Sequence, residues 1–367
     1  MATAVIKDRS LGRGIERLLA ALDYTPAKKK VVIKPNIVVP AKGDSAVVTS
    51  PEVVRHLIRW LYKRGAEDII IGESPALIAD VDKCFEESGF SEMAREEGAA
   101  LVDLSSLPRR KLPWRYGTLF LPDIVFERTY INVAKMKTHV QTTVSLGIKN
   151  QKGLLLPVDK KKFHRLGLHE PIAELSRLIR PELTIIDATF AMDGDGPIWG
   201  GRVKLGLLVG GTEPIDVDLA CLRIMGINPE SVEHLRLLTP EGGYSPEITG
   251  DIEQIKRKFK RPNEESRRIL KLVSWRTASA CTMCTYNAEK ALKRILREPR
   301  NHIKLGRLIK GALITGVNLV FGRTRFPEKP KGRVILIGNC ARIPYEGLDV
   351  TKIPGCPPEV EDIVNKL

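Results

Sequence analysis

Aromatic residues are scarce in this sequence, and long apolar runs are absent. Phe, Trp and Tyr make up 5% of the 367 residues, whereas hydrophobic residues as a whole make up 43%. We therefore expect a core of Val, Ile, Leu and Ala, which suits buried parallel strands flanked by helices. No stretch approaches the length of a membrane-spanning helix, so we expect no membrane span. The apolar segment 312–321 is expected to be a buried or amphipathic helix.

An apolar export signal is missing too. The first nine residues, MATAVIKDR, contain no apolar run long enough for a signal peptide. Six cysteines in such a chain indicate thiolates or metal ligands rather than a disulfide framework. We therefore expect a cytoplasmic protein.

Acidic residues are outnumbered by basic ones, 44 against 59, which gives a net charge of +15. This charge indicates an anionic partner: nucleic acid, an acidic membrane surface, or a phosphorylated or carboxylated small molecule. Nucleic acid is the least favoured, because aromatics are few and no recognised binding motif is present. Surface ion pairing of the kind found in thermophilic proteins would explain the charge equally well.

The sequence has no dinucleotide-binding fingerprint and no Walker A motif, but short apolar runs alternate with helical patterns from residue 29 onward. Ser50, Pro51 and Glu52 form a helix-start signal, and Gly65 ends that helix. Such alternation predicts an α/β fold with a mainly parallel sheet and helices on both faces. Strands are expected at 30–39, 68–72, 183–186 and 203–209, a strand-rich region at 118–133, and helices at 51–64, 81–98, 171–179 and 214–225.

The character of the sequence changes near residue 250. Residues 252–324 are rich in Lys, Arg and Leu at helical spacing, and a strand is expected at 333–337. We therefore expect an α/β domain over residues 1–250 and a helical C-terminal region over residues 251–367.

Basic residues gather near the end of one predicted strand. Lys135, Lys137 and His139 alternate after an apolar run, so they point to one side of the strand. Lys149 and Asn150 follow after a short helical segment. Ammonium, imidazole and amide groups that converge on a loop form a strong site for phosphate or carboxylate. A solvated basic loop is the alternative.

Two carboxylates and an earlier strand end add polar groups. Asp193 and Asp195 stand in a Gly-rich turn, expected to follow a strand that ends at Asp187. Such a pair can bind a divalent cation or act as acid and base, although an Asx-type turn would contain the same residues. Lys34 and Asn36 end another strand and are expected at the same crevice.

Four of the six cysteines lie in the final third of the chain. Cys281 and Cys284 form a C-x2-C pair, and Cys340 and Cys356 can complete a four-sulfur shell. A proline directly after a ligand cysteine, as after Cys356, is common in [4Fe–4S] sites. Zinc and a thioredoxin-like redox pair are alternatives, but zinc ribbons usually supply two C-x2-C pairs. We expect one [4Fe–4S] cluster.

Several other residues are expected to have no role in a site. Cys84 and Cys221 fall on apolar helical faces and are expected to pack in the core. Lys160–Lys162 are expected to be solvated, and His164 and His169 to be isolated.

Seven segments together resemble the DUF362 family, a set of uncharacterised proteins often associated with iron–sulfur clusters. The segments are IKPNIV (33–38), TSPEVVRHLI (49–58), IIIGES (69–74), INVAKMKTH (131–139), SLGIKNQKG (145–153), IIDATFAMDGDGP (185–197) and EPIDVDLACLRIMGI (213–227). The resemblance implies a common site made of Lys34, Asn36, Glu73, Lys135, Lys137, His139, Lys149, Asn150, Asp193 and Asp195. It supplies no reaction. Many members carry closely spaced ferredoxin-like cysteine motifs that this chain lacks, which argues against two-cluster electron transfer.

These observations predict an iron–sulfur protein that is an oxidoreductase or electron-transfer component. It would bind an anionic small molecule and exchange electrons with a redox partner protein. The alternative is a non-redox isomerase, lyase or transferase that acts on a carboxylate or phosphate substrate and contains a structural cluster. The sequence predicts no particular oligomeric state. We expect catalytic roles for Lys135, Lys137, His139, Asp193 and Asp195, and ligand binding by Lys34, Asn36, Glu73, Lys149 and Asn150.

Overall fold

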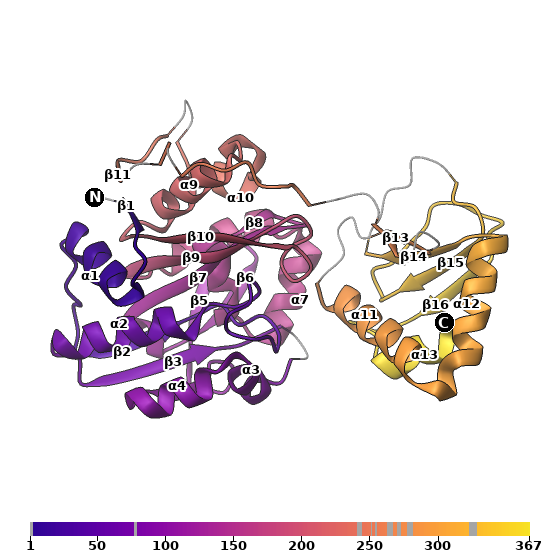
Figure 1. The fold of residues 1–367 in the computed structure, drawn as a ribbon, viewed down its shortest axis with the longest axis horizontal. Coiled ribbons are helices and arrows are strands. Elements are labelled where there is room, and N and C mark those ends of the chain that lie inside the picture. The colour runs from indigo at the N-terminus through magenta and orange to yellow at the C-terminus, as the bar shows by residue number, and fades with distance from the viewer. Residues whose placement is uncertain are drawn as a thin grey trace. The chain divides into compact units, whose positions relative to one another are not determined.

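The computed structural model describes residues 3–76, 79–240, 244–250, 252–253, 255–262, 267–269, 273–276, 282–322 and 329–367. The chain divides into two compact units, Met1–Pro262 and Asn263–Leu367 (Figure 1). The division falls after Pro262, whereas the sequence pattern changes near residue 250.

In the described part of the N-terminal unit, nine strands form one sheet. Its order is β11-β1-β10-β9-β7-β2-β3-β4, and β8 pairs with β7. The pairs from β9 to β4 are parallel, as is β1 with β11, whereas β10 runs antiparallel to both of its neighbours. The expected mainly parallel α/β sheet is confirmed. The strands are β1 (Thr3–Lys7), β2 (Lys30–Lys34), β3 (Asp68–Glu73), β4 (Ala100–Asp103), β7 (Thr129–His139), β8 (Thr143–Ser145), β9 (Leu183–Asp193), β10 (Gly201–Gly211) and β11 (Ile248–Thr249).

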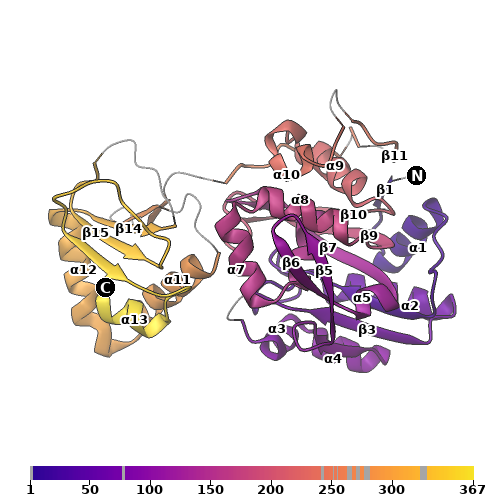
Figure 2. The ribbon, with the colours of Figure 1, turned by 180° about the vertical axis from the view of Figure 1, so that it is seen from behind.

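Helices cover both faces of this sheet, as expected, and can be followed in Figure 1 and from behind in Figure 2. One apolar core joins the sheet to α1 (Leu11–Ala21), α2 (Pro51–Lys63), α3 (Val81–Ser88) and α4 (Phe90–Glu97). The other core joins it to α5 (Ile124–Glu127), α6 (Gly147–Asn150), α7 (Pro157–Leu166), α8 (His169–Leu178), α9 (Pro214–Met225) and α10 (Glu233–Arg236). A hairpin of β5 (Arg109–Trp114) and β6 (Gly117–Pro122) and the short helices η1 (Gln151–Leu154) and η2 (Pro229–Ser231) complete the unit.

Local signals account for several of these boundaries. Helix α2 begins at Pro51 after the N-cap residue Ser50, as its start signal predicts. The helical pattern over 81–98 is two helices, because Gly89 adopts a φ of 81° that ends α3 and starts α4 on a new axis. Cys84 and Cys221 are buried in the two cores, which confirms that they pack there.

Strand β9 is longer than the sequence predicts. We expected it to end at Asp187, but it continues to Asp193 because β10 pairs with its whole length, from Thr184 opposite Gly211 to Asp193 opposite Gly201. Asp187 therefore lies inside the strand, where its side chain is fully buried.

The C-terminal unit contains the expected helices α11 (Thr282–Arg297), α12 (His302–Ile314) and α13 (Val360–Lys366), with η3 (Pro299–Asn301). Its described residues also form a five-stranded sheet of order β12-β13-β14-β15-β16, which is parallel from β13 to β16. The strands are β12 (Arg267–Ile269), β13 (Val273–Arg276), β14 (Val317–Phe321), β15 (Arg333–Ile337) and β16 (Val350–Ile353). The apolar segment 312–321 is thus the end of α12 followed by β14, rather than one helix. Among the residues described, none of the helices combines the length and apolar character needed to span a bilayer.

Candidate functional site

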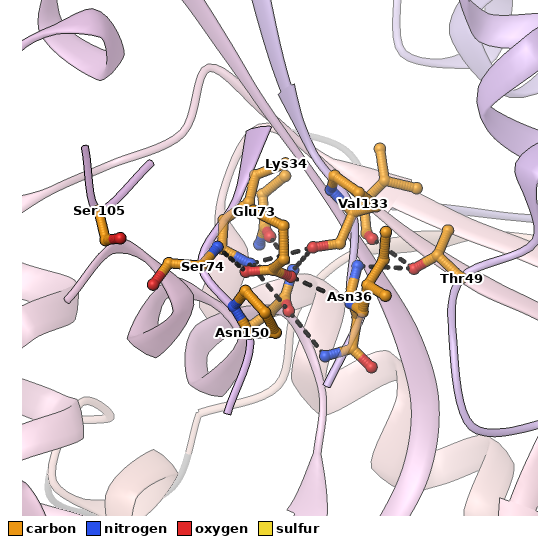
Figure 3. A network of polar contacts seen from close by, with 12 residues as sticks. Lys34, Asn36, Thr49, Glu73, Ser74, Ser105, Val133 and Asn150 are labelled. Atoms are coloured by element: carbon orange, nitrogen blue, oxygen red, sulfur yellow. Dashed lines mark hydrogen bonds and ion pairs between the residues drawn. The ribbon is translucent and has the colours of Figure 1, made fainter. Parts of the chain in front are cut away.

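A network of polar side chains lies at the carboxyl ends of β2, β3 and β7 (Figure 3). Ligands of α/β sheets commonly bind at this edge. We call Lys34, Asn36, Glu73, Lys137 and Asn150 the strand-end network, because hydrogen bonds join each of them to at least one other. All five belong to the segments that resemble DUF362.

Lys34 and Glu73 form a buried ion pair in this network. The Lys34 Nζ lies 2.9 Å from Glu73 Oε1 and 3.0 Å from Oε2, and neither side chain is exposed by more than 3%. Glu73 also accepts hydrogen bonds from the backbone N–H groups of Ile37 and Ser74. A Cβ at Gly153 would overlap both members of the pair, so only glycine lets η1 approach this closely. The pair is neutral overall and anchors the network.

Asn36 connects the two faces of the sheet. Its Nδ2 donates to Asn150 Oδ1 at 3.1 Å, on the α6 face, and its Oδ1 accepts from Lys137 Nζ at 2.5 Å, on the α2 face. The Thr49 hydroxyl accepts from the Asn36 backbone N–H and donates to the Val133 carbonyl, which fixes this loop on β7. The position of Asn36 explains how residues from opposite faces meet at one edge.

Helix α6 carries Lys149 and Asn150 to the network, and a buried carboxylate holds its first turn. Asp218 on α9 accepts hydrogen bonds from the backbone N–H groups of Gly147 (2.8 Å) and Ile148 (3.0 Å). Burial raises the pKa of Asp218 to about 7, although the two N–H groups act in the opposite direction. Asn150 is held further by its Nδ2, which donates to Asn132 Oδ1 at 2.8 Å.

Lys135 lies beside the network but has its own counter-ion. Its Nζ is 2.8 Å from Asp187 Oδ2, and both side chains are buried. Asp187 also accepts from the backbone N–H groups of Ser50 and Thr189. The two charges neutralise each other, so Lys135 offers no positive charge without a counter-ion.

Two further lysines have no carboxylate partner within the described part of the chain. There, the Lys137 side chain donates only to Asn36 Oδ1 and to the carbonyl oxygen of Val47, and the Lys149 side chain forms no hydrogen bond or ion pair. Burial lowers the pKa of each to about 7; the charge of Lys135 adds to the effect on Lys137, and that of Lys137 to the effect on Lys149. Near neutral pH, each side chain can therefore hold or release a proton, and the protonated forms attract anions.

His139 ends β7 next to these lysines. Its Nδ1 accepts from the Gln141 backbone N–H at 3.0 Å, which puts the ring proton on Nε2. Burial lowers its pKa well below the usual value, and the charges of Lys149 and Lys152 lower it further. His139 is therefore a neutral hydrogen-bond donor beside a cationic cluster.

His164 and His169, which are isolated in the sequence, have polar neighbours in the structure. His164 Nε2 lies 2.9 Å from Lys152 Nζ, and the Nδ1 atoms of His169 and His234 lie 3.3 Å apart. Burial lowers the pKa of all three, with a contribution from the charge of Lys149 in each case. No spacing rule links residues 169 and 234, because α8 and α10 meet only through the tertiary fold.

Lys160 is also buried, contrary to expectation. Its Nζ donates to the carbonyl oxygens of Ser74 (2.7 Å) and Pro75 (2.9 Å) and to the Ser74 hydroxyl (2.8 Å). It ties α7 to the loop after β3, and burial lowers its pKa to about 7. Lysine runs on helices are usually solvated, and the contact with residue 74 could not be read from local sequence.

The Asp193 and Asp195 turn is adjacent to β7. The Thr138 hydroxyl donates to the Gly194 carbonyl at 2.8 Å, and Asp193 Oδ2 accepts from the Lys260 backbone N–H at 3.3 Å. Among the described residues, the Asp193 carboxylate forms no ion pair with Lys135, Lys137 or Lys149. Of the residues that the family resemblance groups, Asp193 is therefore not joined to the strand-end network within the described part of the chain.

Three of the four predicted ligand cysteines gather at one end of the C-terminal sheet. Cys284 on α11 is buried, and its Sγ would lie 3.0 Å from a Cβ at Gly338. Gly338 leads from β15 to the exposed Cys340, and the Asn339 backbone N–H donates to the carbonyl oxygen of Gly355, which precedes the exposed Cys356. Cys281 lies outside the described residues. Within those residues, no three His, Cys, Asp or Glu side chains are grouped closely enough to hold a metal.

A protein family, a cyanobacterial protein and a solved structure match parts of this chain. The model of a family described as a domain of unknown function, DUF362, matches residues 31–223, more than half of the chain. The thylakoid-associated protein sll1697 of Synechocystis is 24% identical over 232 residues, which cover 61% of this chain and 71% of that protein. A crystal structure of a Thermotoga maritima protein is similar with a TM-score of 0.34 and 15% identity, and this chain spans about half, 53%, of its length.

Proposed function

This chain belongs to the DUF362 family, and we propose that it is an iron–sulfur protein whose N-terminal unit binds an anionic small molecule. The observation that carries the proposal is the excess of cations at and beside the strand-end network. Lys34 and Lys135 have carboxylate partners, whereas Lys137 and Lys149 have none among the residues that the structure describes.

The energetic cost of ammonium groups that are removed from water without a carboxylate partner supports a ligand of opposite charge. Lys137 is buried and Lys149 is half-buried, and desolvation lowers the pKa of each side chain toward the neutral form. A carboxylate or phosphate between Lys137, Lys149 and His139 would restore the charged state of the lysines and accept the Nε2 proton of His139 as a hydrogen bond. The network then orients the anion, and Asn36 holds Lys137 in place.

The same groups can move protons. An amine with a pKa near 7 holds or releases a proton at neutral pH, which is the condition for general acid–base work. This supports an enzymatic role for the site, with Lys149 and Lys137 acting on a bound carboxylate or phosphate compound. A divalent cation at the Asp193 and Asp195 turn is part of this proposal.

The cysteines of the C-terminal unit fit an iron–sulfur centre. Cys340 and Cys356 follow two parallel strands and are exposed, and Gly338 leaves room beside the Cys284 sulfur that any larger residue would occupy. With Cys281, these thiolates would hold one [4Fe–4S] cluster, which supplies one-electron transfer when bound. An oxidoreductase or electron-transfer role with a redox partner protein follows from it.

A non-redox isomerase, lyase or transferase with a structural cluster is the second candidate. It is favoured by the neutral-range lysines, which need no electron acceptor to do proton chemistry. A cytoplasmic location is part of the proposal for either function.

Anaerobic purification with iron, sulfide and zinc analysis and EPR tests the cluster. We expect iron and sulfide in equal amounts and a signal on reduction. Zinc with no visible charge-transfer absorption would overturn the redox part of the proposal.

Sulfate binding, measured by calorimetry, tests the anion site. Lys149→Met should weaken it by about tenfold or more, the value of one charge-assisted hydrogen bond. Lys161→Met, on the exposed side of α7, is the matched control and should leave affinity unchanged. Equal affinity in the two variants would remove the proposed role of Lys149.

A further inference from the structure

Helix α12 of the C-terminal unit presents large apolar residues to solvent. Leu308 is buried in the core of the unit, but Ile303, Leu313 and Ile314 are 73%, 66% and 69% exposed. Side chains of Val, Leu and Ile gain about 1.5–3 kcal/mol when fully buried, so several of them together on one face indicate a contact surface. The α12 outer face consists of Ile303, Ile309, Lys310, Leu313 and Ile314.

Helical periodicity places these five residues on one side. Ile303, Lys310 and Ile314 are separated by seven and four positions, which brings them onto one stripe, and Ile309 and Leu313 lie four apart beside it. Leu308 and the partly buried Ala312 occupy the opposite side, against the sheet. Both sides of the helix therefore carry aliphatic residues, one side packed in the core and the other exposed to solvent.

The charged residues of this segment are mostly basic. From Leu296 to Ile314 the sequence contains Glu298 as its one acidic residue, and Glu298 is paired with Arg294. The same segment contains Arg297, Arg300, Lys304, Arg307 and Lys310. Aliphatic residues bordered by lysine and arginine without acidic residues are typical of helices that lie in the surface of an anionic membrane.

We propose that the α12 outer face docks this protein on an anionic lipid surface, with the helix parallel to the membrane plane. The aliphatic side chains enter the boundary between headgroups and acyl chains, and the cations bind lipid phosphates. The helix does not cross the bilayer; its 13 residues span about 20 Å. This mode of association is independent of the anion site and of the cluster.

Vesicle co-sedimentation of the full-length protein tests this proposal. We expect binding to vesicles that contain phosphatidylglycerol, no binding to vesicles of phosphatidylcholine alone, and release by salt. Ile303→Asp combined with Leu313→Asp should weaken binding by at least about tenfold. Lys310→Glu should weaken it by about fivefold or more, the effect of one cation near the surface.

Val158→Asp is the matched control. Val158 is 62% exposed on α7 of the N-terminal unit, so it tests the effect of one exposed aliphatic residue outside the α12 outer face. This variant should bind vesicles like the wild type, and all variants should keep the wild-type unfolding midpoint because the changed side chains are exposed.

Three results would overturn the proposal: no binding of the wild type to anionic vesicles, full binding by the double aspartate variant, or a wild-type dimer that the double variant converts to a monomer. The last result would assign the surface to a second copy of this chain.

Discussion

At the scale of single residues, the strand-end network separates paired from unpaired charges. Lys34 and Glu73 neutralise each other in a site that excludes water, and Glu73 is held by two backbone N–H groups as well. Removal of one partner from such a pair leaves the other charge buried and uncompensated. Exposed pairs behave differently, because water screens them.

Glu73→Gln should therefore lower the free energy of unfolding by about 3 kcal/mol. Urea denaturation at neutral pH measures this change. The control is Glu67→Gln in the exposed Lys29–Glu67 pair, which should cost less than about 1 kcal/mol. Equal losses of unfolding free energy in the two variants would mean that the buried Lys34–Glu73 pair costs no more to break than the exposed pair.

The proposed anion binding should depend on pH through Lys137 and Lys149. Desolvation lowers the pKa of both lysines to about 7 in the folded protein, so both lose their charge as the pH rises through that value. Sulfate keeps its own charge across this range. Its affinity should fall by up to about tenfold per pH unit for each lysine that must be protonated, as calorimetry from about one pH unit below to about two units above that pKa can measure.

Stability without ligand should change in the opposite direction. The pKa of each lysine is depressed below the ordinary value of 10.5, so the unfolded chain binds more protons between pH of about 7 and 10.5. These two groups therefore make the folded state more stable as the pH rises through that window. Lys149→Met should reduce this slope, and an unchanged slope would show that Lys149 titrates normally.

At the scale of helices and strands, sequence patterns predicted the features that depend on residues close together in the chain. Pro51 and Gly65 marked α2, and the apolar run before Lys135 marked β7, on which Lys135, Lys137 and His139 are buried. The end of β9 could not be predicted, because its last residues are held by β10 rather than by their own propensity. The contacts of Lys160 with Ser74 and of His169 with His234 likewise join elements that are distant in the sequence.

Asp218 is the clearest residue that sequence reasoning missed. It stands in a helix pattern rich in apolar residues, and nothing nearby in the chain reveals that its carboxylate binds the first turn of α6. The available signal was an acidic residue with apolar neighbours on both sides, because Val217, Leu219 and Ala220 surround Asp218 in α9.

Asp218→Asn should destabilise the protein by about 1–3 kcal/mol, because an amide can accept with only one of its two groups and leaves a buried N–H without a partner. It should also weaken sulfate binding, since α6 carries Lys149. Asp216→Asn, which affects only a contact with the Tyr244 hydroxyl, should leave sulfate affinity intact. Urea denaturation and calorimetry give the two readouts.

At the scale of the whole molecule, the chain consists of two units with separate cores. The strand-end network lies in the first unit, and the cysteines that are predicted to bind the cluster belong to the second. A change at the cysteines should therefore leave the first unit folded.

Cys340→Ser should abolish bound iron and lower the unfolding temperature of the C-terminal unit alone. Scanning calorimetry of the anaerobically purified protein should show two transitions, of which the variant shifts one. A single transition that moves as a whole would mean that the units unfold together.

The position of β1 sets an order of assembly. This strand pairs with β10 on one side and with β11 on the other, although both follow it by most of the length of the N-terminal unit. During synthesis, β1 leaves the ribosome long before β10 and β11 are made. Until then, its backbone N–H and C=O groups must be hydrated or bound by a chaperone. The first and the last strands of the unit in chain order therefore complete one edge of the sheet, and a nascent chain that stopped before β10 would contain the residues of the strand-end network without the strands and the Asp218 contact that complete their surroundings.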